Sequence, residues 1–446
     1  MFYAIDLFCG AGGMSEGIIQ AGFHILFSSD ISEDVEKTYT HRHEQLGLVQ
    51  GENTYFHRGD IRELSGEMIK DKISSLEMFK SPEVKMPEKI DAIFGGPPCQ
   101  GFSRAGKRKV DDPRNLLFKE YLRVIQEVQP KYVVMENVEG FNDTKFYGFQ
   151  GVTGISYEDG KTAPDILLSE FNHIGYNVLK PQVLDASDYG VPQRRRRAIF
   201  IAYLQGEKEP QYPQPTVTDE TRVTVQQAIG DLIRKKKVLQ EINPVDTEYQ
   251  IQSKLGRTPA LNGNPIRSKE GFLNNDLSRH QALIVERFSL FKEGEDGNAV
   301  KKRILTEGIN LKSKPHLLAE CSKKLDMSED EVITAFKKGN VTDEMLDKLL
   351  TRKTIRTRLY RDRPSLTVVT LPDDYISPFE NRTFSVREMA RLQSFDDSFE
   401  FLSKRTTGGP RRKLEVPQYT QVGNAVPPLL ANAIAKEIYK ALEGKA

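Results

Sequence analysis

The amino-acid sequence predicts an α/β fold in which helices cover both faces of a doubly wound sheet. Over residues 1–204, short apolar runs alternate with stretches of helical periodicity. That alternation is typical of parallel strands joined by helical crossovers. The expected strands are the apolar runs 2–8, 24–29, 91–94, 132–135, 178–184 and 198–204, and the clearest helices between them are 14–21 and 116–128.

The composition of the chain changes after residue 204. Residues 205–220 are rich in proline, glutamine and threonine, which is typical of a linker, and the chain beyond them is more polar and less periodic. Helical patterns return at 385–392 and 429–442. We therefore predict a larger domain formed by residues 1–204 and 418–446, with a second, smaller domain inserted over 205–417.

Bulk properties restrict the class of protein. The net charge is +1, so a nucleic-acid surface would have to come from local basic clusters. The three cysteines, Cys9, Cys99 and Cys321, show neither a disulfide framework nor a zinc pattern, so we expect no metal and a reducing, cytoplasmic location. No apolar run approaches the roughly 20 residues of a membrane helix, and no basic leader precedes the first apolar run, so neither a membrane span nor a signal peptide is expected.

A glycine-rich loop, residues 10–13, lies between the first predicted strand and helix, and Asp30 ends the next strand. This arrangement suits a nucleotide-like ligand, with the carboxylate placed for ribose hydroxyls. A third fingerprint glycine would fall at Ser15, and no phosphate-loop lysine follows, so an adenosyl ligand without pyrophosphate fits better. The loop favours S-adenosylmethionine, although by itself it is also compatible with a tight turn. Asp60 is a second carboxylate at a strand end, a position often used for helix capping.

Cys99 follows Pro97 and Pro98 directly after an apolar run. Two prolines fix two φ angles and remove two N–H donors, so the thiol is held on a stiff loop. A buried structural cysteine is the usual alternative. The neighbouring glycines offer few side chains to bury it, which favours a nucleophile able to attack an aromatic ring.

Glu136 follows the apolar run 132–135, where partial removal from water would let a carboxyl group hold or donate a proton. Four arginines occupy 194–197; such runs are commonly solvated patches or targeting signals, but strand alternation would turn Arg195 and Arg197 to one side. Ligands bind at the carboxyl edge of open α/β sheets. The side chains expected at that edge are Asp30, Cys99 and Glu136.

Together these motifs resemble the DNA (cytosine-5)-methyltransferase family in order and spacing, over nearly the whole chain except about 205–355. Asp396 departs from the family, which usually has proline there. The resemblance implies the fold of S-adenosylmethionine-dependent methyltransferases, with a catalytic first domain and a target-recognition domain and hinge over 205–417. The matching stretches are 6–13, 96–103, 136–138, 193–197, 363–367, 385–395 and 421–428.

The resemblance also implies catalytic roles. Cys99 would add to carbon 6 of cytosine, and Glu136 would hydrogen-bond ring nitrogen 3 and the amino group. Arg195 would contact the base carbonyl oxygen, and Arg195 or Arg197 would favour the thiolate. The target cytosine would have to be flipped out of the duplex.

For the methyl donor, the resemblance implies a pocket in which Phe8 lies near the adenine and Asp30 binds the ribose. For duplex DNA, the basic loop after Cys99 would close on phosphates, although a solvated loop is the simpler alternative. The expected cofactor-binding residues are Phe8, Gly10, Gly12, Gly13, Asp30, Ile31, Asp60, Ile61, Pro97, Asn424 and Ala425. The expected DNA-binding residues are Ser103, Arg104, Lys107, Arg108, Arg114 and Arg363.

Two alternatives stay open: a transfer-RNA cytosine-5-methyltransferase and a non-catalytic DNA-binding member. The chain lacks the Cys-Phe-Thr signature of the first, and it retains both Cys99 and Glu136, which the second typically loses. The compact architecture suggests a monomeric prokaryotic restriction-modification or orphan enzyme. A cognate restriction endonuclease would act independently, and the DNA sequence recognised is not readable from the chain.

Overall fold

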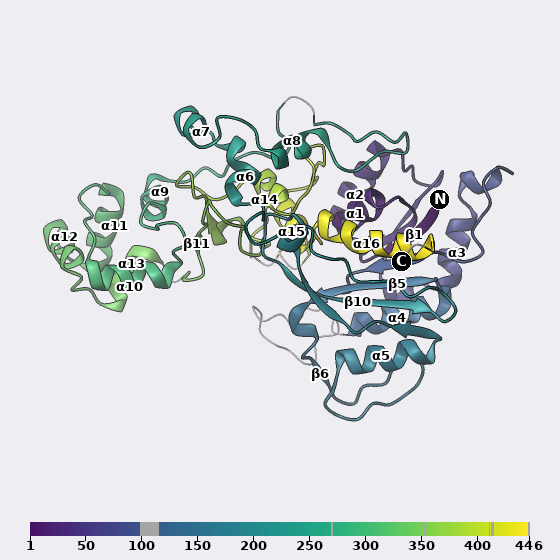
Figure 1. Ribbon diagram of the computed structural model, residues 1–446. Helices are drawn as coiled ribbons and strands as arrows, with labels where there is room; N and C mark the ends of the chain where they lie inside the picture. Colours follow the sequence, from purple (N-terminus) through teal and green to yellow (C-terminus); the bar gives the residue numbers. More distant parts are fainter. Residues whose placement is uncertain (99–115, 269–270, 352, 410, 412–413, 445–446) are drawn as a thin grey trace.

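A mixed eight-stranded sheet lies at the centre of the larger part of the molecule (Figure 1). The computed structural model describes residues 1–98, 116–268, 271–351, 353–409, 411 and 414–444. The strand order is β3-β2-β1-β4-β5-β10-β8, and β9 also pairs with β10. The strands are β1 (Phe2–Leu7), β2 (Phe23–Asp30), β3 (Tyr55–Arg58), β4 (Ala92–Gly95), β5 (Tyr132–Val138), β8 (Tyr176–Val178), β9 (Gln182–Asp185) and β10 (Arg196–Leu204).

Strand directions confirm most of the expected sheet and correct part of it. Strands β3, β2, β1, β4 and β5 are parallel, as predicted, but β10 runs antiparallel to β5, β8 and β9. The short connection after β9, residues 186–195, returns the chain in the opposite direction, which an antiparallel pair permits. The single strand expected over 178–184 is two strands, separated at Pro181, which has no N–H to donate. Strand β5 also extends beyond Met135, so Glu136 lies within the strand.

Alternating strand residues supply two hydrophobic layers, one on each face of the sheet. Ile5 and Leu7 face a layer with α3, α4 and α5, whereas Ala4 faces a layer with α1 and α16. The last helix thus packs against the first, which closes the fold with the C-terminal segment (Figure 1). These helices are α1 (Gly13–Gln20), α2 (Glu33–Gln45), α3 (Gly66–Ser74), α4 (Leu117–Val128), α5 (Ala163–His173) and α16 (Pro428–Leu442).

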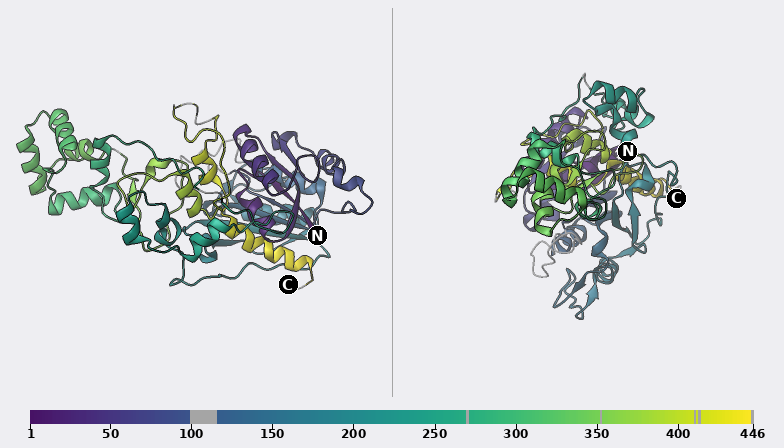
Figure 2. Two further views of the ribbon diagram at one scale, coloured as in Figure 1. Left: turned by 90° about the horizontal axis from the view of Figure 1, so that it is seen from above. Right: turned by 90° about the vertical axis from the view of Figure 1, so that its left-hand side faces the viewer.

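The rest of the described chain forms two further clusters. One joins residues 225–249 and 359–401 to Ala11 and to the segment 419–425. The other is the helical lobe, residues 282–350, which has its own hydrophobic core. It projects from the end of the molecule opposite to the sheet (Figure 2). The elements of these regions are α6 (Val225–Ile229), α7 (Lys236–Ile242), α8 (Glu248–Leu255), α9 (Ala282–Phe288), α10 (Gly297–Glu307), α11 (Pro315–Leu325), α12 (Glu329–Lys338), α13 (Asp343–Leu350), α14 (Val386–Leu392), α15 (Gln418–Asn424) and the short parallel pair β11 (Thr357–Arg358) and β12 (Tyr375–Ile376).

A small antiparallel pair, β6 (Lys145–Phe146) with β7 (Lys161–Thr162), precedes α5. In the part of the chain that the structure describes, no helix combines the length and the apolar character needed to cross a membrane.

The packing of α1 on α16 depends on Gly17. A Cβ atom at Gly17 would lie 2.5 Å from the Ala431 Cβ, the Asn432 nitrogen and the Pro428 oxygen. We expect Gly17→Val to lower the free energy of unfolding by about 3 kcal/mol, because two packed helices must separate. Urea unfolding measures the change. Gly408→Val is the matched control, because a Cβ at Gly408 meets no atom within 4 Å; equal losses in the two variants would contradict the packing argument.

Candidate active site

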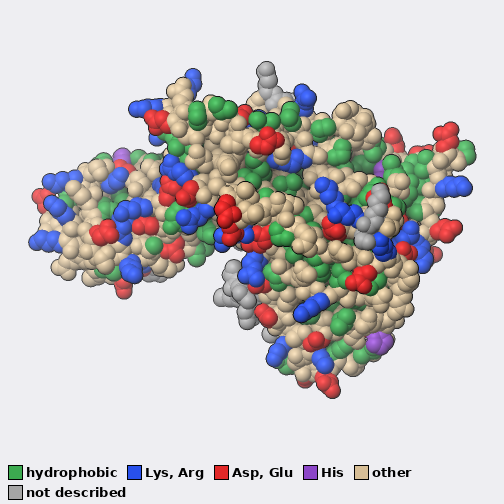
Figure 3. All heavy atoms as spheres, in the orientation of Figure 1, with side chains coloured by type: hydrophobic (Ala, Val, Ile, Leu, Met, Phe, Trp, Pro, Cys, Tyr) green, Lys and Arg blue, Asp and Glu red, His purple; other side chains and the backbone are tan. Residues whose placement is uncertain are grey.

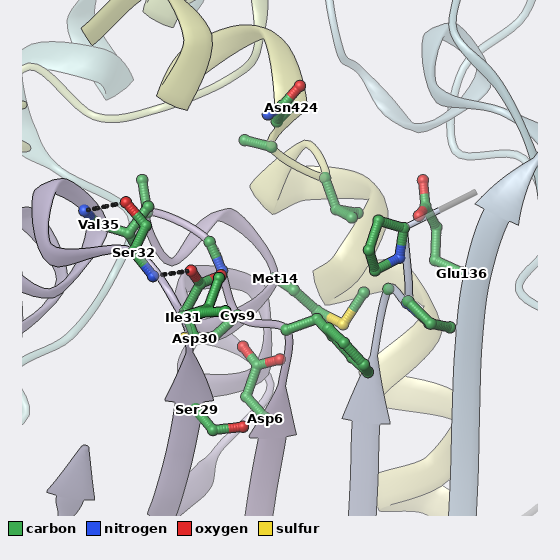
Figure 4. Close-up of a pocket in the computed structure, with 18 of the residues that line it drawn as sticks. Asp6, Cys9, Met14, Ser29, Asp30, Ile31, Ser32, Val35, Glu136 and Asn424 are labelled. Carbon is green, nitrogen blue, oxygen red and sulfur yellow. Dashed lines mark hydrogen bonds between the residues drawn. The ribbon is translucent and has the colours of Figure 1, made fainter. Parts of the chain in front are cut away.

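The carboxyl ends of the parallel strands open into a cavity of about 560 Å³ (Figure 4). Its volume is in the range of small-molecule sites. The loops after β1, β2, β3 and β4, the end of β5, the start of β10 and residues 416–426 all contribute to its wall. The predicted site residues that line it are Phe8, Gly10, Asp30, Ile31, Asp60, Ile61, Pro97, Glu136, Arg195, Arg197, Asn424 and Ala425.

The glycine-rich loop brings the backbone close to Asp30. Phe8 and Gly10 have φ angles of 57° and 53°, so the chain turns sharply after β1 through the left-handed region. The Gly10 amide donates to the Asp30 Oδ2 at 3.2 Å, and the Ser32 amide donates to its Oδ1 at 2.9 Å. Burial raises the pKa of Asp30, and these amide hydrogen bonds oppose the rise. Two amides therefore fix the carboxylate at the end of β2.

Gly12 and Gly13 shape the loop without lining the cavity. Gly12 has a φ of 99°, and a Cβ there would lie 3.2 Å from the Tyr39 ring. Gly13 begins α1, where a Cβ would be 2.3 Å from the Val426 oxygen. The expected contribution of these two glycines is therefore backbone approach and packing.

Asp60 takes both of the roles weighed from the sequence. It lines the cavity, and its side chain caps a single helical turn by accepting from the Arg62 amide at 3.0 Å. The Arg62 guanidinium also binds this carboxylate, which lowers the pKa of Asp60. Ile61 is buried beside it, whereas Ile31 is 67% exposed at the rim.

The stretch after β4 leads from the sheet into the cavity wall. Asn137 on β5 donates its side-chain amide to the Pro97 oxygen at 3.1 Å. A Cβ on Gly96 would be 3.3 Å from the Glu136 Oε2, so the Glu136 carboxylate lies directly over this stretch. The predicted residues Cys99, Ser103, Arg104, Lys107, Arg108 and Arg114 lie outside the described residues.

Glu136 forms an ion pair with Arg197. The Arg197 Nε and the Glu136 Oε1 are 2.8 Å apart, and both side chains are largely buried. Antiparallel pairing sets this contact, because it places Arg197 opposite Val138 at the end of β5. The intervening Arg196 turns away and pairs with Glu139 at 3.1 Å near the surface.

Arg195 lies deeper and on the same side as Arg197, as predicted. Its Nη1 donates to the Gly423 oxygen at 3.2 Å, while its Nε has no hydrogen-bond partner among the described residues. Burial, together with the charge of Arg197, lowers the pKa of Arg195. This arginine therefore joins the start of β10 to the segment that carries Asn424. Gly423 and Gln421 also line the cavity and were not predicted to do so, although both fall in the motif 421–428.

Asp6 and Cys9 are further lining residues that were not predicted. Asp6 accepts from the Ser15 hydroxyl at 2.5 Å, and its Oδ1 has no partner among the described residues. Burial raises the pKa of Asp6 to about 7. Burial also raises the pKa of Cys9, which disfavours the thiolate form there. The signal for Asp6 was its place within an otherwise apolar strand.

The polar and apolar side chains that line the cavity suit an adenosyl ligand. The Asp30 carboxylate suits hydroxyl donors. Phe8, Ile61 and Met14 supply apolar surface, and the Asp6 Oδ1 has no hydrogen-bond partner among the described residues. In the described part of the chain, His, Cys, Asp and Glu side chains form no group of three or more that could hold a metal ion.

Comparison with known proteins assigns this architecture to a family. The family model for C-5 cytosine-specific DNA methylases matches residues 2–440. The chain belongs to the C-5 cytosine-specific DNA methylase family. Its activity is the methylation of carbon 5 of cytosine in DNA, with S-adenosylmethionine as the methyl donor. The family and the α/β methyltransferase fold expected from the sequence are thereby confirmed.

Relatives of this cytosine methylase are similar along nearly their whole length. The type II methyltransferase M1.HphI of Haemophilus parahaemolyticus is 33% identical, over 98% of this chain and 86% of its own. The type II methyltransferase M.DdeI of Desulfomicrobium norvegicum is 31% identical, over 97% of this chain and 88% of its own. A solved structure from an Escherichia coli prophage, described as a DNA modification methyltransferase, has a TM-score of 0.61 at 24% identity, covering 99% of this chain and all of that one.

The raised pKa of Asp6 predicts a pH-dependent stability. The ordinary value is 3.8, so between about pH 4 and pH 7 the folded protein holds a proton that the unfolded chain releases. The contribution of this group to the free energy of unfolding is full below about pH 4. It declines between about pH 4 and pH 7, by at most about 1.4 kcal/mol per pH unit, and is lost above pH 7. Urea unfolding of the wild type and Asp6→Asn at pH 5 and pH 8 checks this. The variant should lose less stability at pH 8; parallel profiles would contradict the assignment.

Proposed function

We propose that this methylase acts on a cytosine flipped out of duplex DNA, through a covalent bond to Cys99, within a restriction-modification system. The observation that carries the proposal is the placement of Glu136, paired with Arg197, directly over the Gly96–Pro98 stretch that leads to Cys99. The same cavity holds Asp30 and the glycine-rich loop on its other side. The names of the type II relatives support the restriction-modification context.

The proposed chemistry begins with the Cys99 thiolate, which adds to carbon 6 of the cytosine. Glu136 holds a proton between its carboxyl group and ring nitrogen 3, so the electron pair displaced from the ring double bond reaches carbon 5. S-adenosylmethionine supplies the methyl group that carbon 5 accepts. Methyl transfer leaves S-adenosylhomocysteine. The carbon 5 proton then passes to solvent water, its bonding pair re-forms the ring double bond, and the sulfur–carbon 6 bond breaks with its electrons returning to the Cys99 thiolate.

The two buried arginines have distinct proposed roles. Arg197 orients the Glu136 carboxylate through the 2.8 Å ion pair and stays near the ring of the bound base. Arg195 carries donors without a full set of partners, which suits it to the base carbonyl oxygen. Both cations also favour the thiolate form of a neighbouring cysteine.

The proposed methyl-donor site uses the wall opposite Glu136. Asp30, held by two backbone amides, accepts from ribose hydroxyls. Phe8 and Ile61 contact the adenine, with Ile31 at the rim. The other proposed contacts come from Gly10, Asp60, Pro97, Asn424 and Ala425, whereas Gly12 and Gly13 support the loop through its backbone and packing.

Residues 205–417 are proposed as the target-recognition domain and hinge. Arg363 is exposed and stacks on Tyr360 at 3.9 Å, within a segment that pairs with the arginine run: the Arg194 amide donates to the Ser365 oxygen at 2.8 Å. Phosphate contacts from Arg363 and from the loop residues Ser103, Arg104, Lys107, Arg108 and Arg114 would position the duplex. On the face shown in Figure 3, basic side chains are interspersed with acidic ones, so such contacts would be local.

The chain is proposed to act as a monomer, independently of any restriction endonuclease that cleaves the same sequence.

Transfer of label from S-adenosylmethionine tests the substrate class. We expect label in duplex DNA and none in transfer RNA, because the target cytosine is presented by flipping from a duplex. Cys99→Ala should lower the rate about a thousandfold or more, as loss of a covalent nucleophile does. Cys321→Ala, a thiol buried in the helical lobe, should retain activity. Label only in RNA, or an active Cys99→Ala, would refute the proposal.

Glu136→Gln tests the proton-holding role. Its kcat should fall by about a hundredfold or more, since general acid–base catalysis contributes that much. Glu139→Gln is the matched control, because Glu139 lies three residues away and pairs with the exposed Arg196. Steady-state kinetics on duplex DNA compare them; similar losses in both variants would count against a catalytic role for Glu136.

A further inference from the structure

A short piece of the predicted recognition region reaches back to the helix that starts the methyl-donor loop. This anchor segment, residues 256–261, follows α8 and contacts α1 and the chain just after α2. The Thr258 hydroxyl donates to the Glu16 Oε2 in α1 and accepts from the Gln20 side chain at 2.9 Å. The Leu261 amide donates to the Leu46 oxygen at 2.9 Å, just after α2. The anchor segment thus lies on the catalytic sheet's helices, far from the helical lobe.

Asp396 holds the anchor segment in place. Its Oδ2 accepts from the amides of Arg257 at 2.7 Å and Thr258 at 3.1 Å. Its Oδ1 accepts from the Arg257 guanidinium at 2.8 Å. Asp396 is 2% exposed, so this carboxylate is satisfied almost entirely by the anchor segment. Proline, which the sequence analysis noted as usual at this position in the family, has no side-chain acceptor for these three donors.

Glu16 links the anchor segment to the loop itself. It is 2% exposed, and its charge is balanced by Arg42, whose Nε and Nη2 lie 2.8 and 3.0 Å from its two oxygens. Its backbone amide donates to the Gly12 oxygen at 2.9 Å, in the first turn of α1. Because a buried carboxylate must keep its donors, moving Thr258 would move Glu16 and with it the turn that holds Gly12.

We propose that Thr258 and Arg257 are positioning residues for the methyl-donor loop, so that a segment of the region outside the catalytic sheet helps to hold the methyl donor. The inference rests on the proposed methyl-donor site. It extends that site to residues that touch neither the cavity nor the substrate: Thr258 acts through Glu16 on the Gly12 turn, and Arg257 acts by holding the anchor segment on Asp396.

Direct binding of S-adenosylhomocysteine, measured by calorimetry without DNA, tests the proposal. Thr258→Val keeps the shape of the side chain and removes the hydroxyl. Its Kd for S-adenosylhomocysteine should rise about five- to tenfold, because only part of the free energy of a hydrogen bond to a charged group is transmitted to the loop. Thr258→Ser restores the hydroxyl and should bind like the wild type. Asp396→Asn, which leaves the Arg257 guanidinium without a charged partner, should also bind more weakly.

Thr247→Val is the matched control for stability. Thr247 caps α8 in the same region and donates to the Gln227 oxygen, and its side-chain hydrogen bonds go to Gln227 and Gln250 rather than to α1. It should lower the melting temperature without weakening S-adenosylhomocysteine binding. If Thr258→Val unfolds too readily for calorimetry, the rise in its melting temperature with added S-adenosylhomocysteine reports the same affinity.

The outcomes distinguish failure of the positioning role of Thr258 from failure of the proposed methyl-donor site. Wild-type binding by Thr258→Val, or equal weakening by Thr247→Val, would overturn the positioning role and leave the proposed function intact. Failure of the wild type to bind S-adenosylhomocysteine would overturn the proposed methyl-donor site itself.

Discussion

The antiparallel pairing of β10 with β5 is the constraint on which the proposed catalytic side of the cavity depends. A strand that runs against its neighbour begins where the neighbour ends, so the arginine run enters the sheet at its carboxyl edge. Arg197 lies opposite Val138 and reaches the Glu136 carboxylate. Had β10 run parallel to β5, this guanidinium would lie at the opposite edge of the sheet. The two edges are separated by the length of the strand, which rises about 3.3 Å per residue. The ion pair in turn compensates two charges that burial would otherwise penalise.

The charged groups of the cavity differ in how their burial is compensated. Glu136 has a cation, and Asp30 has two backbone amides. Asp6 and Arg195 each keep an atom without a partner among the described residues. Burial raises the pKa of Asp6 and lowers the pKa of Arg195, so in both cases it disfavours the charged form. An unpaired buried polar atom costs about 1–3 kcal/mol. Such atoms in the wall of a cavity are natural places for a ligand's polar groups to complete the hydrogen bonding.

Residues from both ends of the chain close the site. The C-terminal helix α16 packs on α1 at Gly17, and the segment before it contributes Gly423, Asn424 and Ala425 to the cavity. The anchor segment also contacts α1, through the hydrogen bond from the Thr258 hydroxyl to Glu16. The helix α1, which follows the glycine-rich loop, is therefore fixed by parts of the chain that are hundreds of residues away.

The sequence by itself determined the early strands, the glycine-rich turn and the edge at which Asp30 and Glu136 meet, because apolar periodicity and glycine placement act locally and parallel strands share one edge. It also placed Arg195 and Arg197 on one side, since alternation is a property of any strand. Even Pro181 was a local signal for the break between β8 and β9. Only the tertiary structure decided the direction of β10, the pairing of Arg197 with Glu136 and the contact of Thr258 with Glu16. Strand order, strand direction and burial join residues distant in sequence, and no local pattern encodes them.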